Sequence, residues 1–195
     1  MRLLIAALAL VCGAALAASI GQPAPDFSLK DVTGRSVKLA DYRGRYVVLE
    51  WVNPECPYVQ KHYGSRNMQA LQRDYTGQNV AWLSIDSTNA DHAEYYAPDK
   101  LAGWMRRMGG APTATLLDPT GTVGRAYGAR TTPQLFIVDP KGALIYAGAI
   151  DDTRSTDPDD VKTAKNYVRA ALGEALAGRA VTDASTRSYG CSIKY

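Results

Sequence analysis

The chain has 195 residues and a formal net charge of +3 at neutral pH. A balance so close to neutral, with no long run of Lys or Arg, argues against a nucleic-acid partner and against a strongly charged docking surface. No internal repeat is visible, and the length suits one compact domain.

The first 17 residues have the composition of an export signal. Arg2 supplies the positive start, Leu3 to Leu10 form an apolar run, and Ala15-Leu16-Ala17 offers small residues for cleavage before Ala18. The apolar run is shorter than the roughly 20 residues that span a bilayer. We therefore expect a removable signal over residues 1–17, no stable membrane span, and a mature protein that is periplasmic or secreted.

Export would place the remaining cysteines in an oxidising compartment. Cys12 lies within the signal, and Val11 before it is not the small residue of a lipoprotein site, so lipidation is a minor alternative. The mature chain keeps Cys56 and Cys191, which can pair within one chain or between two. Cys191 can be a resolving partner for Cys56, half of a permanent staple, or a free terminal thiol.

Apolar periodicity and turn residues predict strands and helices that alternate along the chain. In order, they are a hairpin over 27–39, a buried strand over 46–51, a helical region over 57–75 broken at Gly64-Ser65, a buried strand over 80–85, a helical stretch over 90–108 interrupted near Pro98, a strand over 113–117, a short helix over 123–127, a strand over 134–138, a turn over 139–142, a returning strand over 143–148, and a last helix from Asp157 to Gly178. This order predicts a three-layer α/β domain with a mixed central sheet over 18–178. A tail over 179–195 carries Cys191.

Cys56 stands where a predicted buried strand meets a predicted helix. Pro57 follows it, and proline is favoured at the first position of a helix. A thiol at a helix N-terminus lies near the positive end of the dipole and near free backbone N–H groups, which stabilise the nucleophilic thiolate. Because reaction sites in α/β sheets favour the carboxyl ends of strands, we predict a reactive thiol here rather than a buried small hydrophobe.

Three stretches together resemble the thioredoxin-like redoxins, which include thioredoxins, cytochrome-maturation thioredoxins and peroxiredoxins of the alkyl hydroperoxide reductase/thiol-specific antioxidant family. They are Gly21 to Phe27, Leu49 to Pro57 and Thr131 to Gly142, in that order. The resemblance covers about residues 20–150 and implies a thioredoxin-like fold with an N-terminal hairpin. It also implies that Cys56 is the nucleophile and that Pro133 is a cis-proline facing it. Pro112 is the weaker candidate for the cis-proline.

The motif around Cys56 departs from both branches of that superfamily. Val59 stands where a thioredoxin has the second cysteine of Cys-x-x-Cys, so dithiol exchange within this motif is excluded. Asn53 stands where a peroxiredoxin has a threonine, and Leu49 replaces a family proline. Asn53 can still donate a hydrogen bond, so we retain it as a site residue and leave the substrate as either a peroxide or a disulfide.

We therefore predict an exported thiol oxidoreductase in which Cys56 attacks the substrate and Cys191 resolves the product. An external thiol reductant or a thiol/disulfide protein partner would reopen the resulting disulfide, and no organic cofactor or metal is required. A non-enzymatic binding or structural domain with a permanent Cys56–Cys191 disulfide is the alternative. The electron donor and the oligomeric state are open.

The remaining polar and aromatic residues have structural interpretations. A copper chaperone is disfavoured because Cys56 and His62 would lie on different helix faces and His92 is the only other histidine. We expect His62 at the surface or half-buried, Trp51 in the core, and Asp151 as a cap.

Overall fold

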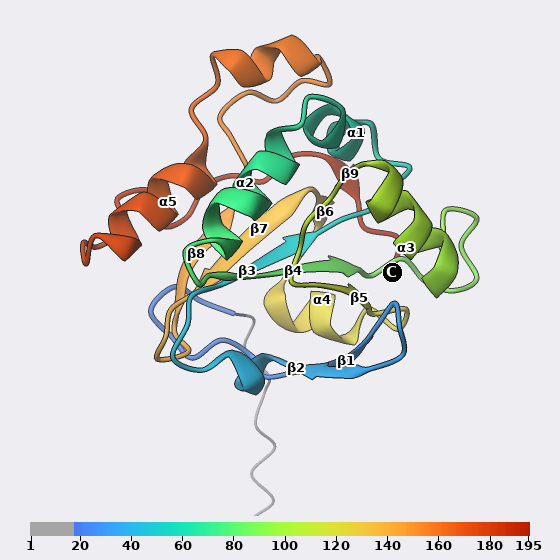
Figure 1. Cartoon of the computed structure of the whole chain (residues 1–195), viewed down its shortest axis with the longest axis horizontal. Coiled ribbons are helices and arrows are strands. Elements are labelled where there is room, and N and C mark those ends of the chain that lie inside the picture. Colours follow the sequence, from blue (N-terminus) through green and yellow to red (C-terminus); the bar gives the residue numbers. More distant parts are fainter. Residues whose placement is uncertain (1–17) are drawn as a thin grey trace, which may run out of the picture.

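A computed structural model describes residues 18–195, so the predicted signal over 1–17 lies outside the described residues. A seven-stranded mixed sheet with the order β2-β1-β5-β4-β3-β7-β8 crosses the centre of the molecule (Figure 1). The central strands β3, β4 and β5 are parallel, whereas β7 runs antiparallel to β3 and β8 antiparallel to β7. The helices α1, α2, α3 and α5 lie on one side of this sheet and α4 lies on the other (Figure 1). The predicted three-layer α/β architecture is confirmed.

The element bounds agree with the predicted order over most of the chain. The strands are β1 (Ser28–Asp31), β2 (Ser36–Lys38), β3 (Val47–Trp51), β4 (Ala81–Asp86), β5 (Ala114–Leu117), β6 (Thr131–Thr132), β7 (Gln134–Val138), β8 (Leu144–Gly148) and β9 (Cys191–Ser192). The helices are η1 (Leu39–Tyr42), α1 (Pro57–Gly64), α2 (Asn67–Thr76), α3 (Pro98–Arg107), α4 (Thr122–Tyr127), η2 (Pro158–Lys162) and α5 (Tyr167–Leu176). The predicted break near Gly64-Ser65 separates α1 from α2.

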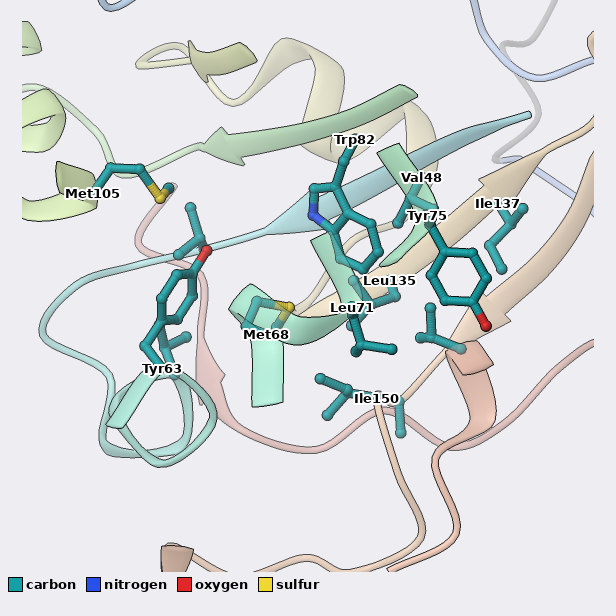
Figure 2. Close-up of a cluster of buried hydrophobic side chains, with 14 of the residues drawn as sticks. Val48, Tyr63, Met68, Leu71, Tyr75, Trp82, Met105, Leu135, Ile137 and Ile150 are labelled. Atoms are coloured by element: carbon teal, nitrogen blue, oxygen red, sulfur yellow. The ribbon is translucent and has the colours of Figure 1, made fainter. Parts of the chain in front are cut away.

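Alternation along the strands gives the sheet two apolar faces, because successive side chains of a strand point to opposite sides. In β3, Val48 faces the layer of α1, α2, α3 and α5, whereas Leu49 faces α4 and the N-terminal hairpin. Figure 2 shows the first of these clusters, in which Trp82 from β4 lies beside Leu71 from α2. Trp51 is fully buried, so its predicted core position is confirmed, and Trp82 is fully buried as well.

The predicted helical stretch over 90–108 is wrong in its first half. Residues 87–97 contain turns and no helix, with the His92 N–H donating to the Asn89 carbonyl. The helix α3 begins only at Pro98, which occupies its first turn. Proline lacks the N–H that a continuing helix needs, so it starts this helix instead of interrupting one.

The predicted last helix is divided in two. Asp157 caps η2 through its side chain, as predicted, but α5 has its own N-cap in Asn166, whose side chain accepts the Arg169 N–H. Each cap satisfies backbone donors that only a helix start leaves free, so two caps mark two helices. Gly178, with φ of +71°, follows the end of α5 at the predicted place.

The tail over 179–195 runs back along the domain. Its backbone joins β8 through the hydrogen bonds from Ala147 N–H to the Ala184 carbonyl and from Thr186 N–H to the Ala147 carbonyl. Further on, β9 pairs antiparallel with β6, a short strand that the sequence did not predict (Figure 1). The tail is therefore an ordered part of the domain. Within residues 18–195, no helix has the length and apolar character to cross a bilayer.

Candidate active site

Cys56 lies at the junction of β3 and α1. It is the N-cap residue of α1, in an extended conformation, and Pro57 occupies the first turn of the helix. The Cys56 N–H donates to the Asn53 carbonyl at 3.1 Å, which closes the turn between strand and helix. The residue is only 2% exposed, so its thiol is covered in this structure.

The segment around Pro133 lies directly against this thiol. The Cys56 Sγ donates to the Thr132 carbonyl oxygen at 3.0 Å. The Thr132–Pro133 peptide bond is cis, as the resemblance implies. The register explains the proximity, because Trp51 at the end of β3 pairs with Gln134 at the start of β7. Pro133 therefore lies at the same edge of the sheet as Cys56.

The tail brings Cys191 to the same point. Cys191 in β9 is the pairing partner of Thr132 in β6, and both cysteines are free thiols. Burial, together with the nearby Cys56 thiol, raises the pKa of Cys191 to about 12. Cys191 thus keeps its proton at neutral pH.

Gly190 permits this close approach of the tail. Its φ is +135°, in the region that disfavours residues with a Cβ atom. A Cβ added there would lie 2.0 Å from the Thr132 carbonyl oxygen. The tail backbone therefore rests directly on the peptide group that also accepts the Cys56 thiol.

Two tyrosines hold the tail on either side of Cys191. The Tyr189 ring packs edge-on against Tyr58 with 5.7 Å between ring centroids. The Tyr195 hydroxyl donates to the Ala129 carbonyl at 2.7 Å. These contacts place Cys191 without a covalent link.

A cluster of buried polar side chains holds the hydroxyl group of Tyr189. Its hydroxyl donates to Asp151, which was predicted to be a cap; the prediction missed this partner because it is 38 residues away. His62 is fully buried, so the prediction of a surface or half-buried position is wrong. Its Nε2 lies 3.3 Å from the Tyr189 hydroxyl and its Nδ1 lies 3.0 Å from the Asn67 amide nitrogen. Burial lowers the pKa of His62 to about 3, so the imidazole is neutral.

Asn53 shapes the turn before Cys56. Its Oδ1 accepts the Glu55 N–H at 2.7 Å, and its Nδ2 donates to Thr88 at 3.0 Å and to Glu94 at 3.1 Å. These partners occupy its side-chain amide in this structure. A role for Asn53 toward substrate stays a prediction.

Glu50 is a buried acid that the sequence interpretation overlooked. It is fully buried in β3 on the face toward α1 and α2. Its carboxylate accepts hydrogen bonds from Trp82 Nε1 at 2.7 Å, Ser84 Oγ at 2.8 Å, Tyr63 Oη at 2.9 Å and Gln72 Nε2 at 3.1 Å. Burial raises the pKa of Glu50, and these hydrogen bonds oppose the shift. The available signal was one acidic residue within an otherwise apolar strand.

The chemistry that this site offers is that of thiols. Among residues 18–195, no group of three or more His, Cys, Asp or Glu side chains is arranged to hold a metal ion. His62 is engaged in its buried cluster, and His92 accepts the Glu94 N–H in a surface turn. Two thiols beside one peptide group, one of them at a helix N-terminus, can exchange with a disulfide or react with a peroxide.

Comparison with known proteins agrees with this chemistry. A family model described as the AhpC/TSA family matches residues 20–147. The chain is 33% identical over 137 residues to peroxiredoxin-2 of Cricetulus griseus, covering 65% of this chain and 67% of that protein. It is 28% identical over 135 residues to the thiol-disulfide oxidoreductase ResA of Geobacillus thermodenitrificans, covering 66% and 68%.

Among solved structures, that of a hypothetical protein from Sinorhizobium meliloti 1021 superimposes with a TM-score of 0.80 at 28% identity, covering 92% of this chain and 96% of that one. The structure of a putative thiol:disulfide interchange protein DsbE from Chlorobium tepidum superimposes with a TM-score of 0.56 at 23% identity, covering 67% of this chain and 85% of that one, so the predicted thioredoxin-like fold is confirmed. The family match ends before the tail, so Cys191 lies outside it.

Proposed function

Because the chain belongs to the AhpC/TSA family, we propose that it is an exported thiol oxidoreductase in which Cys56 attacks a peroxide or a disulfide and Cys191 resolves the product. The family and the likeness to ResA imply thiol or disulfide substrates. Export to the periplasm or beyond the cell rests on the signal-like composition of residues 1–17.

The observation that carries the proposal is the meeting of two free thiols at one carbonyl group. Cys56 donates to the Thr132 oxygen, and Cys191 pairs with Thr132 in the neighbouring strand. The raised pKa of Cys191 supports different roles for the two thiols, because a protonated thiol is a poor nucleophile. Cys56, at the N-terminus of α1, is accordingly the thiol that attacks first.

With a peroxide, the Cys56 thiolate attacks one oxygen and the O–O bond breaks. Cys56 becomes a sulfenic acid, and the other oxygen leaves as an alcohol or as water after taking a proton. The Cys191 sulfur then attacks the Cys56 sulfur, and the Cys191 proton leaves with the hydroxyl group as water. The protein is left with a Cys56–Cys191 disulfide.

With a disulfide substrate, the Cys56 thiolate forms a mixed disulfide and releases one substrate thiol. Cys191 then displaces the second substrate thiol and forms the same protein disulfide. In both cases two electrons from an external thiol reductant restore Cys56 and Cys191 as thiols. This step needs a partner, because no further cysteine lies within residues 18–195.

A structural domain with a permanent Cys56–Cys191 disulfide is the alternative. Its support is the ordered tail, which pairs with β6 and β8. However, the contacts of Tyr189 and Tyr195 hold the tail without help from a covalent link. A covalent staple is not needed to dock this segment, which favours the redox interpretation.

The test is a thiol count by alkylation and intact mass on reduced protein, before and after one equivalent of hydrogen peroxide. Rapid loss of both thiols is expected, with Cys56→Ser abolishing it and Cys191→Ser accumulating oxidised Cys56. Oxidation at the rate of an ordinary thiol would remove the peroxide branch. Equilibration with glutathione then distinguishes a disulfide-exchange enzyme from a structural domain. A structural disulfide has a potential below about −300 mV and stays oxidised.

A further inference from the structure

A hollow of about 300 Å³ lies where α1 meets α2, beside the end of α3. Its lining includes Arg66, Arg73 and Arg107 and contains no acidic residue. The helix α1 starts after Cys56 and ends at Gly64, which lines this hollow. Eight helical residues span about 12 Å, so the hollow lies at the opposite end of α1 from the thiol. It is distinct from the site described above.

The three arginines line the hollow without a carboxylate among the other lining residues. All three are exposed, and among the described residues none of them forms an ion pair. Asp74, the acid next to Arg73 in sequence, pairs instead with Arg169 at 3.0 Å. The hollow thus gathers three positive charges that the protein itself leaves uncompensated.

The start of α2 adds to this positive charge. Arg66 is its N-cap residue, has φ of +64°, and provides no side-chain cap; the first turn contains no acidic residue. A cation at the positive end of a helix is unfavourable, and N-cap positions favour side chains that accept hydrogen bonds. The left-handed backbone of Arg66 is a further cost for a residue other than glycine. An anion in the hollow would offset the first two of these costs.

The walls of the hollow suit such a ligand. Gln69 is buried, and its Nε2 donates to the Tyr63 carbonyl at 2.8 Å and to the Met108 carbonyl at 2.6 Å. These two carbonyl oxygens, which would repel an anion, therefore already accept hydrogen bonds from Gln69. The Oε1 of Gln69 is buried and has no hydrogen-bond partner among the described residues. A Cβ at Gly64 or Gly109 would meet nothing within 4 Å, so the rim is open.

We propose that this hollow binds a doubly charged oxyanion of the phosphate or phosphate-monoester class. The guanidinium group of arginine presents parallel N–H donors that match two oxygens of a phosphate group. The uncapped N–H groups at the start of α2 can supply further donors. The hollow is larger than one phosphate group, which leaves room for the organic part of a small monoester.

Isothermal titration of the reduced full-length protein with inorganic phosphate and with glycerol phosphate tests the proposal. Saturable binding to one site is expected, and it should weaken as salt rises because the arginines are exposed. Arg107→Gln should weaken binding about tenfold, the loss expected for one charge-assisted contact. Arg106→Gln is the matched control, because Arg106 is also exposed at the end of α3 but does not line the hollow. It should change the affinity less than about twofold.

Absence of saturable binding by both probes would overturn the proposal. Equal weakening by Arg106→Gln and Arg107→Gln would also overturn it, since that result indicates diffuse attraction to net charge. Tighter binding of glycerol phosphate than of phosphate would identify an organic monoester as the ligand, and equal binding would identify the free anion. Cys56→Ser should bind both probes like the unmodified protein, so the result is independent of the thiol chemistry.

Discussion

Gly190→Ala tests whether the tail must rest on the Thr132–Pro133 peptide group for Cys191 to reach Cys56. The new Cβ would lie 2.0 Å from the Thr132 oxygen, whereas real Cβ contacts essentially never fall below 3.0 Å. The tail or the carbonyl group must therefore move by at least about 1 Å. A misplacement of about 1 Å at reacting groups can cost about 100-fold in rate.

We expect the oxidised form of Cys56 to appear at least as fast in Gly190→Ala as in the unmodified protein, because a displaced tail covers this thiol less. Closure of the Cys56–Cys191 disulfide should be slowed about 100-fold. Acid quenching after one equivalent of hydrogen peroxide, followed by alkylation and intact mass, separates the two steps. Denaturant unfolding checks that the domain itself remains folded.

Gly178→Ala is the matched control. Gly178 also has a positive φ, of +71°, but a Cβ there meets nothing within 4 Å. The substitution therefore brings backbone strain without a clash and should leave disulfide closure unchanged. Disulfide closure in Gly190→Ala at the rate of the unmodified protein would refute the reasoning. Cys191 would then not need the observed backbone path of the tail in order to react with Cys56.

Three further substitutions examine the buried polar groups. Tyr189→Phe removes the donor to Asp151 and should weaken tail docking by about 1–3 kcal/mol, seen as faster amide exchange at Cys191; unchanged exchange would contradict this. His62 has a folded pKa of about 3 against 6.5 ordinarily, so the unfolded chain takes up the proton first and stability falls as pH decreases from 6.5 toward 3. Urea unfolding should show this fall, at most about 1.4 kcal/mol per pH unit, and His62→Gln should lack it; parallel pH profiles would argue against a neutral buried imidazole. Glu50→Ala removes an acceptor shared by four buried donors, of which, within residues 18–195, only Gln72 keeps another partner, the Tyr63 hydroxyl. It should cost about 3 kcal/mol or more in urea unfolding, and a loss below about 1 kcal/mol would contradict the network.

Local sequence determined most of the elements and the position of Cys56. Buried strands such as β3 and β4 are visible as apolar runs, and Pro57 marks a helix start, because these signals depend only on neighbouring residues. The same locality explains the errors. Pro98 suggests an interruption, although a proline begins a helix as readily as it breaks one, and a continuous apolar stripe hides the cap at Asn166.

Tertiary structure alone decided what surrounds Cys56. The sequence left Cys191 as a partner, a staple or a free thiol, because 135 residues separate it from Cys56 and no local rule places a tail. The β6–β9 pairing and the anchors of Tyr189 and Tyr195 bring it to Thr132. The burial of His62 likewise depends on which elements pack over it, since helix periodicity reports a face but not what covers that face.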